Sequence, residues 1–227
     1  MSLRNQSLLP DQYYHIYNRG NGKNKIFLDR EDYNRFIKIL YICNSENKFI
    51  FREFIKKKQI DAFDFERGDP IVSIGAWVLM PNHFHILLIS HRQGLWQNNS
   101  NPITMYMQKV STSYVMYFNK KYKRTGSLFE GKFKSKNIFE GNYLQYLFSY
   151  IHLNPIKLIQ KDWKEKGILN KKESLEFLNT YKYSSFLDYI GNNRKEDKIL
   201  DKKLFPESFV NIQPNELFGI FSNYNQP

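Results

Sequence analysis

The spacing of apolar residues predicts a protein of mixed α and β structure. Residues 13–19 (YYHIYNR) alternate in polarity and are rich in β-formers, which predicts a first strand. Apolar residues then recur at helical spacing over about 30–43. Asp29 precedes this stretch and Asp32 follows three positions later, so we expect a capped amphipathic helix.

Two apolar runs near the middle of the chain predict a pair of buried strands. Residues 71–80 (IVSIGAWVLM) form a continuous apolar run, and residues 83–90 (HFHILLIS) form the next one. Pro81 and Asn82 lie between them and are typical of a turn. We therefore expect an antiparallel hairpin at the centre of a sheet.

The second half of the chain alternates between helical and extended patterns. An apolar stripe at helical spacing predicts a helix over 102–121. The lysines of 132–136 (KFKSK) alternate with other residues, which predicts a strand with lysines on one face. A further helix is predicted over 140–153, and it should stop near Asn154 because Pro155 disfavours helical geometry in the residue before it.

The order of these elements predicts the fold class. Strand, helix, strand, strand, helix and strand form the βαββαβ arrangement of an α+β, ferredoxin-like domain with helices packed on an antiparallel sheet. We assign this domain to residues 1–160, with an insertion at about 45–70. Residues 161–227 are expected to form a mostly helical C-terminal extension.

Charge favours a polyanionic partner. Lys and Arg total 34 against 22 Asp and Glu, a formal net charge of +12. Nucleic acid is the commonest such partner, although a lysine-rich solvated surface explains the charge equally well. The single cysteine, Cys43, excludes an internal disulfide, and no apolar run suits a signal peptide or a membrane span. We therefore expect a cytoplasmic protein without membrane contact.

His83 and His85 form a candidate metal-binding pair. Residues i and i+2 of a strand point to the same face, roughly 6–7 Å apart, so both imidazoles can reach one ion. Phe84, between them, should face the core. The alternative is two partly buried histidines that bond to the backbone.

Tyr150 and Asn154 lie four residues apart on the predicted helix 140–153 and its end, so both project from one face. An Asn carbonyl oxygen is a hard ligand that suits Mg²⁺ or Mn²⁺. A tyrosine phenol can act as a covalent nucleophile once it is activated. The alternative is simple packing, since the chain has 16 tyrosines.

Read together, these motifs resemble a known family. AWVLMPNHFHILL at 76–88, followed by YIHLNP at 150–155, is similar to the HUH single-tyrosine transposases, and most similar to their IS200-like, REP-associated branch. Four further segments agree in order: YHIYNRGNGKNKIF at 14–27, DREDYNRFIKIL at 29–40, RTGSLFEGKFKSK at 124–136 and YKYSSFLDYIG at 181–191. The resemblance therefore covers most of residues 13–191.

The resemblance implies a ferredoxin-like catalytic domain and a specific reaction. His83 and His85 match the metal-binding pair, Tyr150 matches the nucleophile, and Asn154 falls where some relatives place a Gln as the third ligand. The implied cofactor is Mg²⁺ or Mn²⁺, and the implied partner is single-stranded or hairpin DNA. Tyr150 would attack a phosphodiester, form a 5′-phosphotyrosine link and release a 3′-OH that can later reverse the step.

Basic residues of the first loop and of the predicted lysine strand are the candidates for DNA contact. They are Arg19, Lys23, Lys25, Arg124, Lys132 and Lys134. Phosphate contacts of this kind would make binding salt-sensitive, and the alternative for each is a solvated surface charge. His15, on the first strand, has no paired ligand in sequence and is expected to be structural.

Three other functions stay open. Ferredoxin-like sheets also form non-catalytic nucleic-acid-binding modules, although these carry aromatic and basic residues on the central strands where this chain has His-Phe-His. A replication initiator or relaxase would use related chemistry. A degenerate transposase would bind DNA without mobility. A homodimer is compatible with all of these readings.

Overall fold

The computed structural model describes residues 8–45, 61–90, 101–139, 141–210 and 212–224. Its centre is a four-stranded antiparallel sheet in the order β2-β3-β1-β4. The strands are β1 (Tyr13–Arg19), β2 (Ser73–Met80), β3 (His83–Ile89) and β4 (Lys134–Ile138). With α1 (Arg30–Ile42) between β1 and β2 and α3 (Pro102–Lys121) between β3 and β4, this order is that of a ferredoxin-like fold and confirms the predicted class.

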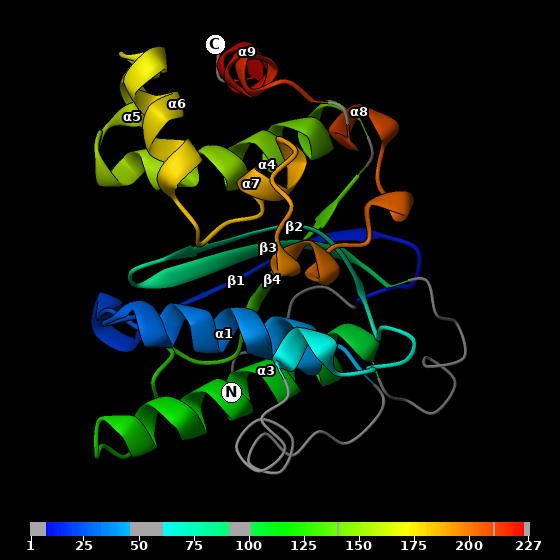
Figure 1. Cartoon of the computed structure of the whole chain (residues 1–227), viewed down its shortest axis with the longest axis vertical. Coiled ribbons are helices and arrows are strands. Elements are labelled where there is room, and N and C mark those ends of the chain that lie inside the picture. The colour runs from blue at the N-terminus through cyan, green and yellow to red at the C-terminus, as the bar shows by residue number, and fades with distance from the viewer. Residues whose placement is uncertain (1–7, 46–60, 91–100, 140, 211, 225–227) are drawn as a thin grey trace.

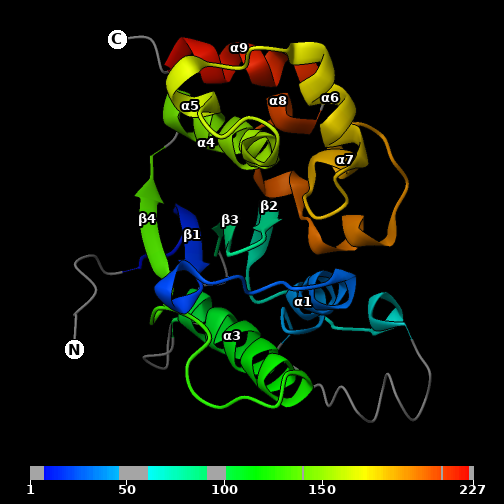
Figure 2. The same ribbon diagram turned by 90° about the vertical axis from the view of Figure 1, so that its left-hand side faces the viewer.

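Helices cover both faces of this sheet (Figures 1 and 2). One face carries α1 (Arg30–Ile42) and α3 (Pro102–Lys121). The other carries α4 (Asn142–Leu153) and most of the C-terminal part of the chain. That part contains α5 (Trp163–Lys166), α6 (Lys171–Thr180), α7 (Phe186–Tyr189), α8 (Glu207–Val210) and α9 (Pro214–Tyr224). The extension beyond residue 160 is therefore helical, as predicted.

Local signals placed most element boundaries correctly. β1 and α3 span the predicted residues, and α1 begins after Asp29, whose side chain accepts from the Asp32 backbone N–H in a capping box. α4 ends at Leu153, before the short 3₁₀ helix Asn154–Leu158. The last strand is shorter than expected, since Lys132 lies before β4 begins.

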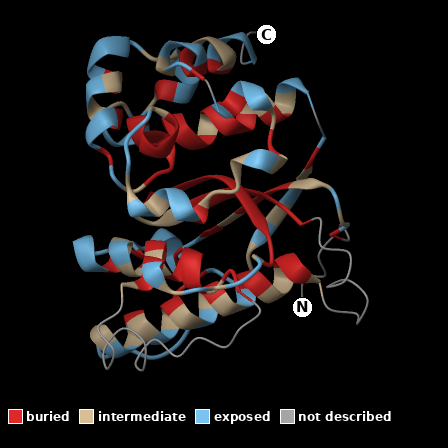
Figure 3. Cartoon of the chain, turned by 45° about the vertical axis from the view of Figure 1, so that its right-hand side comes forward, coloured by how far each residue is buried: buried red, intermediate tan, exposed pale blue. Residues whose placement is uncertain are grey.

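The face of the sheet toward α1 and α3 is apolar. Tyr14 and Ile16 of β1 and Phe84 and Ile86 of β3 point to this side, and each is at most 1% exposed. They alternate with the residues that point to the α4 side, because successive side chains of a strand face opposite ways. Figure 3 shows β2 and β3 almost entirely buried between the two helical layers, whereas β4 is largely exposed or half-buried.

Residues 181–189 cover the outer edge of β2. The Tyr181 hydroxyl donates to the Leu79 carbonyl at 2.6 Å, and the Tyr189 hydroxyl donates to the Gly75 carbonyl at 2.5 Å. The backbone N–H of Ser185 donates to the Trp77 carbonyl at 2.9 Å. These bonds occupy backbone groups that would otherwise form an open edge, which gives the motif at 181–191 a structural role.

The expected insertion at 45–70 lies largely outside the described residues, which omit 46–60. Its described part contains a short 3₁₀ helix, Ala62–Asp64. Within the described part of the chain, no helix is long and apolar enough to cross a membrane.

Candidate metal and nucleophile site

The α4 side of the sheet carries polar residues in neighbouring strands. His83 and His85 of β3 pair with Arg19 and Tyr17 of β1, and Tyr17 pairs in turn with Lys134 of β4. Directly paired residues of an antiparallel sheet point to the same face. The register therefore places two imidazoles, a phenol and basic groups side by side.

The two histidines of β3 lie close enough to share a ligand. Their ring centroids are 5.0 Å apart, and His85 is only 7% exposed. The His83 Nδ1 forms a 2.6 Å hydrogen bond with the Oδ1 of Asn82. Phe84 between them is fully buried against Phe36 on the other face, as the alternation predicted.

His15 has a partner, contrary to the expectation from sequence. Its Nε2 shares a 2.8 Å buried hydrogen bond with the Nδ1 of His85, and the two rings lie 4.9 Å apart. The partner is 70 residues away in sequence, so only the pairing of β1 with β3 reveals it. His15 therefore belongs to the site as a residue that orients His85.

Tyr150 reaches the histidines from α4. Its ring lies 5.4 Å from that of His85 and 6.4 Å from that of His15, edge-on in both cases. The Lys164 ammonium group donates to the Tyr150 hydroxyl at 2.9 Å and lies 4.1 Å from the centre of its ring. Lys164 was not singled out from the sequence, because no local pattern relates it to Tyr150.

Asn154 is a buried amide beside His83 and Tyr150. The residue is 1% exposed, and its Oδ1 has no hydrogen-bond partner within ordinary geometry. A buried polar atom without a partner is costly, and a bound cation is one way to satisfy it. The side chain also interacts with both His83 and Tyr150, which places it between them. The structure thus brings the four predicted residues together.

The side chains of His83 and His85 fit Mg²⁺ or Mn²⁺ only if the amide oxygen of Asn154 also binds the ion. Within the described ranges, no group of three or more His, Cys, Asp or Glu side chains is placed to hold a metal ion. Two imidazoles together with the Asn154 oxygen would supply three ligands and leave positions open for a phosphate and water.

Burial keeps the histidines neutral. It lowers the pKa of His83 to about 4 and that of His15 to about 3, and nearby lysines add to both effects. Burial also lowers the pKa of His85 well below its usual value. Neutral imidazoles have a free lone pair at neutral pH, as metal binding requires. Burial raises the pKa of the Tyr150 phenol, so this group needs assistance to ionise.

Most of the predicted DNA-contacting residues lie around one end of β1. Glu130 pairs with Arg19 at 2.6 Å, and its backbone N–H donates to the Arg19 carbonyl. The Asn82 amide donates to the Lys23 carbonyl at 3.1 Å, which ties the first loop to the turn before His83. Lys23, Lys25, Lys132 and Lys134 are all exposed.

Arg124 is placed differently. Its guanidinium lies 5.5 Å from the ring of Phe118, a residue of the core that α1 and α3 form. It donates to the Ser127 carbonyl at 3.1 Å, within its own loop. Arg124 therefore lies beside α3, which covers the face of the sheet opposite to the one that carries His83 and His85.

His152 faces away from the nucleophile, as expected. It is fully buried, and its Nε2 bonds to the Ser185 Oγ at 2.8 Å, beneath the segment that covers β2. Its role is structural.

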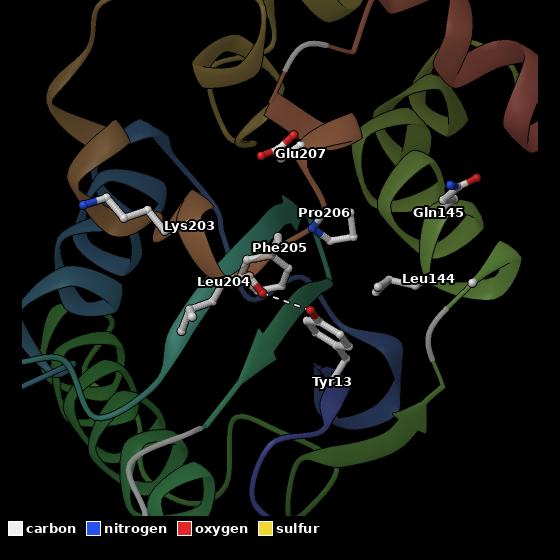
Figure 4. A pocket seen from close by; sticks show the side chains of 9 residues that line it. Tyr13, Leu144, Gln145, Lys203, Leu204, Phe205, Pro206 and Glu207 are labelled. Carbon is white, nitrogen blue, oxygen red and sulfur yellow. Dashed lines mark hydrogen bonds between the residues drawn. The ribbon is translucent and has the colours of Figure 1, made fainter.

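A separate hollow of about 520 Å³ lies at the other end of β1 (Figure 4). The Tyr13 hydroxyl borders it and donates to the Leu204 carbonyl at 3.0 Å. Tyr13 lies six residues from Arg19, the partner of His83, which is about 20 Å along the strand. The hollow is therefore far from His83, although Tyr13 lies only two residues from His15 on the same face of β1, about 7 Å along the strand.

The chain is similar in structure to a solved protein. No family model matches the chain, and no curated protein matches its sequence. A solved structure described as a REP-associated tyrosine transposase bound to a REP hairpin is similar at 13% identity and a TM-score of 0.49. The match covers 92% of this chain and 96% of that chain.

Proposed function

We propose that this protein is a metal-dependent transposase that cuts and rejoins single-stranded DNA through Tyr150. The main support is the approach of Tyr150 from α4 to the β3 histidines, with 5.4 Å between its ring and that of His85. The unpaired buried oxygen of Asn154 in the same place is the second support.

His83, His85 and Asn154 would hold the divalent ion. When bound, Mg²⁺ or Mn²⁺ would polarise the scissile phosphate and stabilise the charge that develops on it. The hydrogen bond between His15 and His85 orients the second of the two histidine ligands. If His85 uses its Nε2 for the ion, its Nδ1 carries the proton and donates to the Nε2 of His15.

Tyr150 would carry out the covalent step. The phenol gives its proton to solvent, its oxygen forms a bond to phosphorus, and the bond from phosphorus to the 3′ oxygen breaks. The departing 3′ oxygen takes up a proton from water, which leaves a 5′-phosphotyrosine link and a 3′-OH. Lys164 holds the phenol oxygen and would stabilise negative charge on it. A 3′-OH can reverse the step, so rejoining needs no nucleotide cofactor.

The proposed partner is single-stranded or hairpin-forming repeat DNA. The net charge of +12 and the exposed basic residues around the end of β1 suit a polyanion beside the site. Hairpin preference follows from the resemblance to the REP-associated branch in sequence.

A gel assay tests the proposal. Labelled single-stranded hairpin DNA is incubated with the protein and Mn²⁺ and then run on a denaturing gel, where a covalent adduct is expected. Tyr150→Phe should remove this adduct, and Tyr146→Phe, one turn earlier on the same face of α4, should retain it. EDTA should also remove it. An adduct that persists in Tyr150→Phe would refute the nucleophile, and hairpin binding without any adduct would favour the non-catalytic module.

A further inference from the structure

α4 carries a row of tyrosines that ends at the proposed nucleophile. Tyr143, Tyr146 and Tyr150 recur at i, i+3 and i+7, so they share one face of the helix. Adjacent rings lie 5.8 Å and 6.2 Å apart, and all three side chains are partly exposed. A row that served only the core would be buried along its length, and this one reaches solvent.

α9 extends the row sideways. Tyr224, which is 43% exposed, stacks on Tyr146 at 4.2 Å and lies 5.7 Å from Tyr143. Phe221 packs beneath Tyr146 at 5.6 Å and is itself 2% exposed. Tyr143, Tyr146, Tyr150 and Tyr224 therefore form a surface, here called the tyrosine stripe, whose rings are held in place from below.

A lysine lies at each end of the tyrosine stripe. The Lys136 ammonium contacts the Tyr143 hydroxyl at 2.7 Å and lies 4.3 Å from the centre of its ring. Lys164 makes the equivalent contacts with Tyr150, at 2.9 Å and 4.1 Å. Both cations contact phenol oxygens rather than carboxylates, so an incoming phosphate need not displace an ion pair.

The dimensions of the tyrosine stripe match a short unpaired strand. Seven residues of α-helix separate Tyr143 from Tyr150, which is about 10 Å. Bases in a stacked strand repeat at about 3.4 Å, so the stripe has room for about three nucleotides. Aromatic rings that stack bases, combined with cations that contact phosphates, are the usual means of binding single-stranded nucleic acid without reading its sequence.

We propose that the tyrosine stripe binds the unpaired nucleotides that flank the cleaved phosphate. The strand would run from Tyr150 along α4 to the β4 edge, with bases against Tyr143 and Tyr224 and phosphates near Lys136 and Lys164. The placement beside the cut rests on the proposed function, whereas binding of unpaired bases does not require cleavage.

Binding of a labelled dT10 strand in EDTA tests this site apart from chemistry. The wild-type protein should bind dT10 about tenfold more tightly than an abasic strand of equal length, because only the former offers rings to stack. The double variant Tyr143→Leu/Tyr224→Leu should lose this preference. Phe177→Leu changes a half-buried aromatic residue on α6 and should keep it.

Charge and location are tested separately. Lys136→Gln should weaken the binding of both dT10 and the abasic strand. It should also lower the slope of log affinity against log salt concentration by about one, as the loss of one phosphate contact predicts. Should the double variant fail to fold, photocrosslinking of wild-type protein to an iodouracil strand replaces it, and adducts should map to the stripe. A base preference that survives in the folded double variant, or crosslinks confined to other surfaces, would overturn the proposal. Failure of the proposed function would instead appear as a missing Tyr150 adduct with the base preference intact.

Discussion

The two faces of the central sheet are built from the same strands and differ in almost every other respect. Phe84 points toward α1 and α3, where the neighbouring residues are apolar and buried. His85, one residue later, points toward α4 and lies beside His15 and Tyr150. The comparison teaches that one strand can supply core packing and candidate chemistry together, because its side chains alternate between two environments.

The largest effect is expected on the α4 face. His85→Gln should slow formation of the DNA adduct about a thousandfold, because losing a ligand removes several kcal/mol of charge stabilisation at the phosphate. The free energy of unfolding should change by only about 1 kcal/mol. Adduct formation measured over time, alongside urea unfolding, separates the two quantities. Unimpaired adduct formation would contradict the metal role.

On the opposite face a substitution should change the free energy of unfolding strongly and the rate of adduct formation little. Phe84→Ala should lower the free energy of unfolding by about 3–5 kcal/mol, because it leaves a cavity beside Phe36. Adduct formation per folded molecule should stay close to that of the wild type. Urea unfolding measures the loss, and a cost below about 1 kcal/mol would show that this face does not hold the core.

His15 should have an intermediate effect. His15→Phe keeps an aromatic ring but removes the hydrogen bond to His85, so Mn²⁺ affinity should fall about 10–100-fold. Calorimetric titration with Mn²⁺ measures this change. His15→Gln can still accept a hydrogen bond and should recover part of the affinity, and His152→Gln, at a histidine bonded to Ser185, should leave it unchanged. If all three variants bound Mn²⁺ with the same affinity as the wild type, His15 would have no role in the metal site.

The smallest effect is a dependence of stability on pH. Burial lowers the pKa of His152 to about 3, whereas an unfolded histidine has a pKa near 6.5. Between these pH values the unfolded chain binds more protons than the folded chain. The contribution of neutral His152 to the free energy of unfolding is therefore complete above about pH 6.5 and is lost as the pH falls toward 3. At pH 5 the loss is about 2 kcal/mol for this group. His152→Gln should make unfolding free energy less sensitive to pH from 7 to 5; an unchanged dependence would contradict the assignment.

Much of the fold could be predicted because its signals are local. The capping box at Asp29, the alternation of 13–19 and the turn at Pro81 each depend on residues within a few positions. The meeting of Tyr150 with His85 could also be anticipated, but only by reading two distant motifs together. Boundaries without a strong local signal were less accurate, as at Lys132, which lies before β4.

Tertiary structure decided the contacts between distant segments. His15 has no partner in sequence, yet the register of β1 against β3 brings it to His85. Lys164 contacts Tyr150 because the chain folds back after α4, and Arg124 lies beside Phe118 instead of at the histidines.

The amino-acid sequence by itself thus determined which elements form and which side chains carry the candidate chemistry. Propensity, capping and periodicity act over short distances, so they can be read from the chain. Strand order, register and helix docking determined which of those side chains meet. These depend on packing between residues far apart in sequence, and no local pattern encodes them.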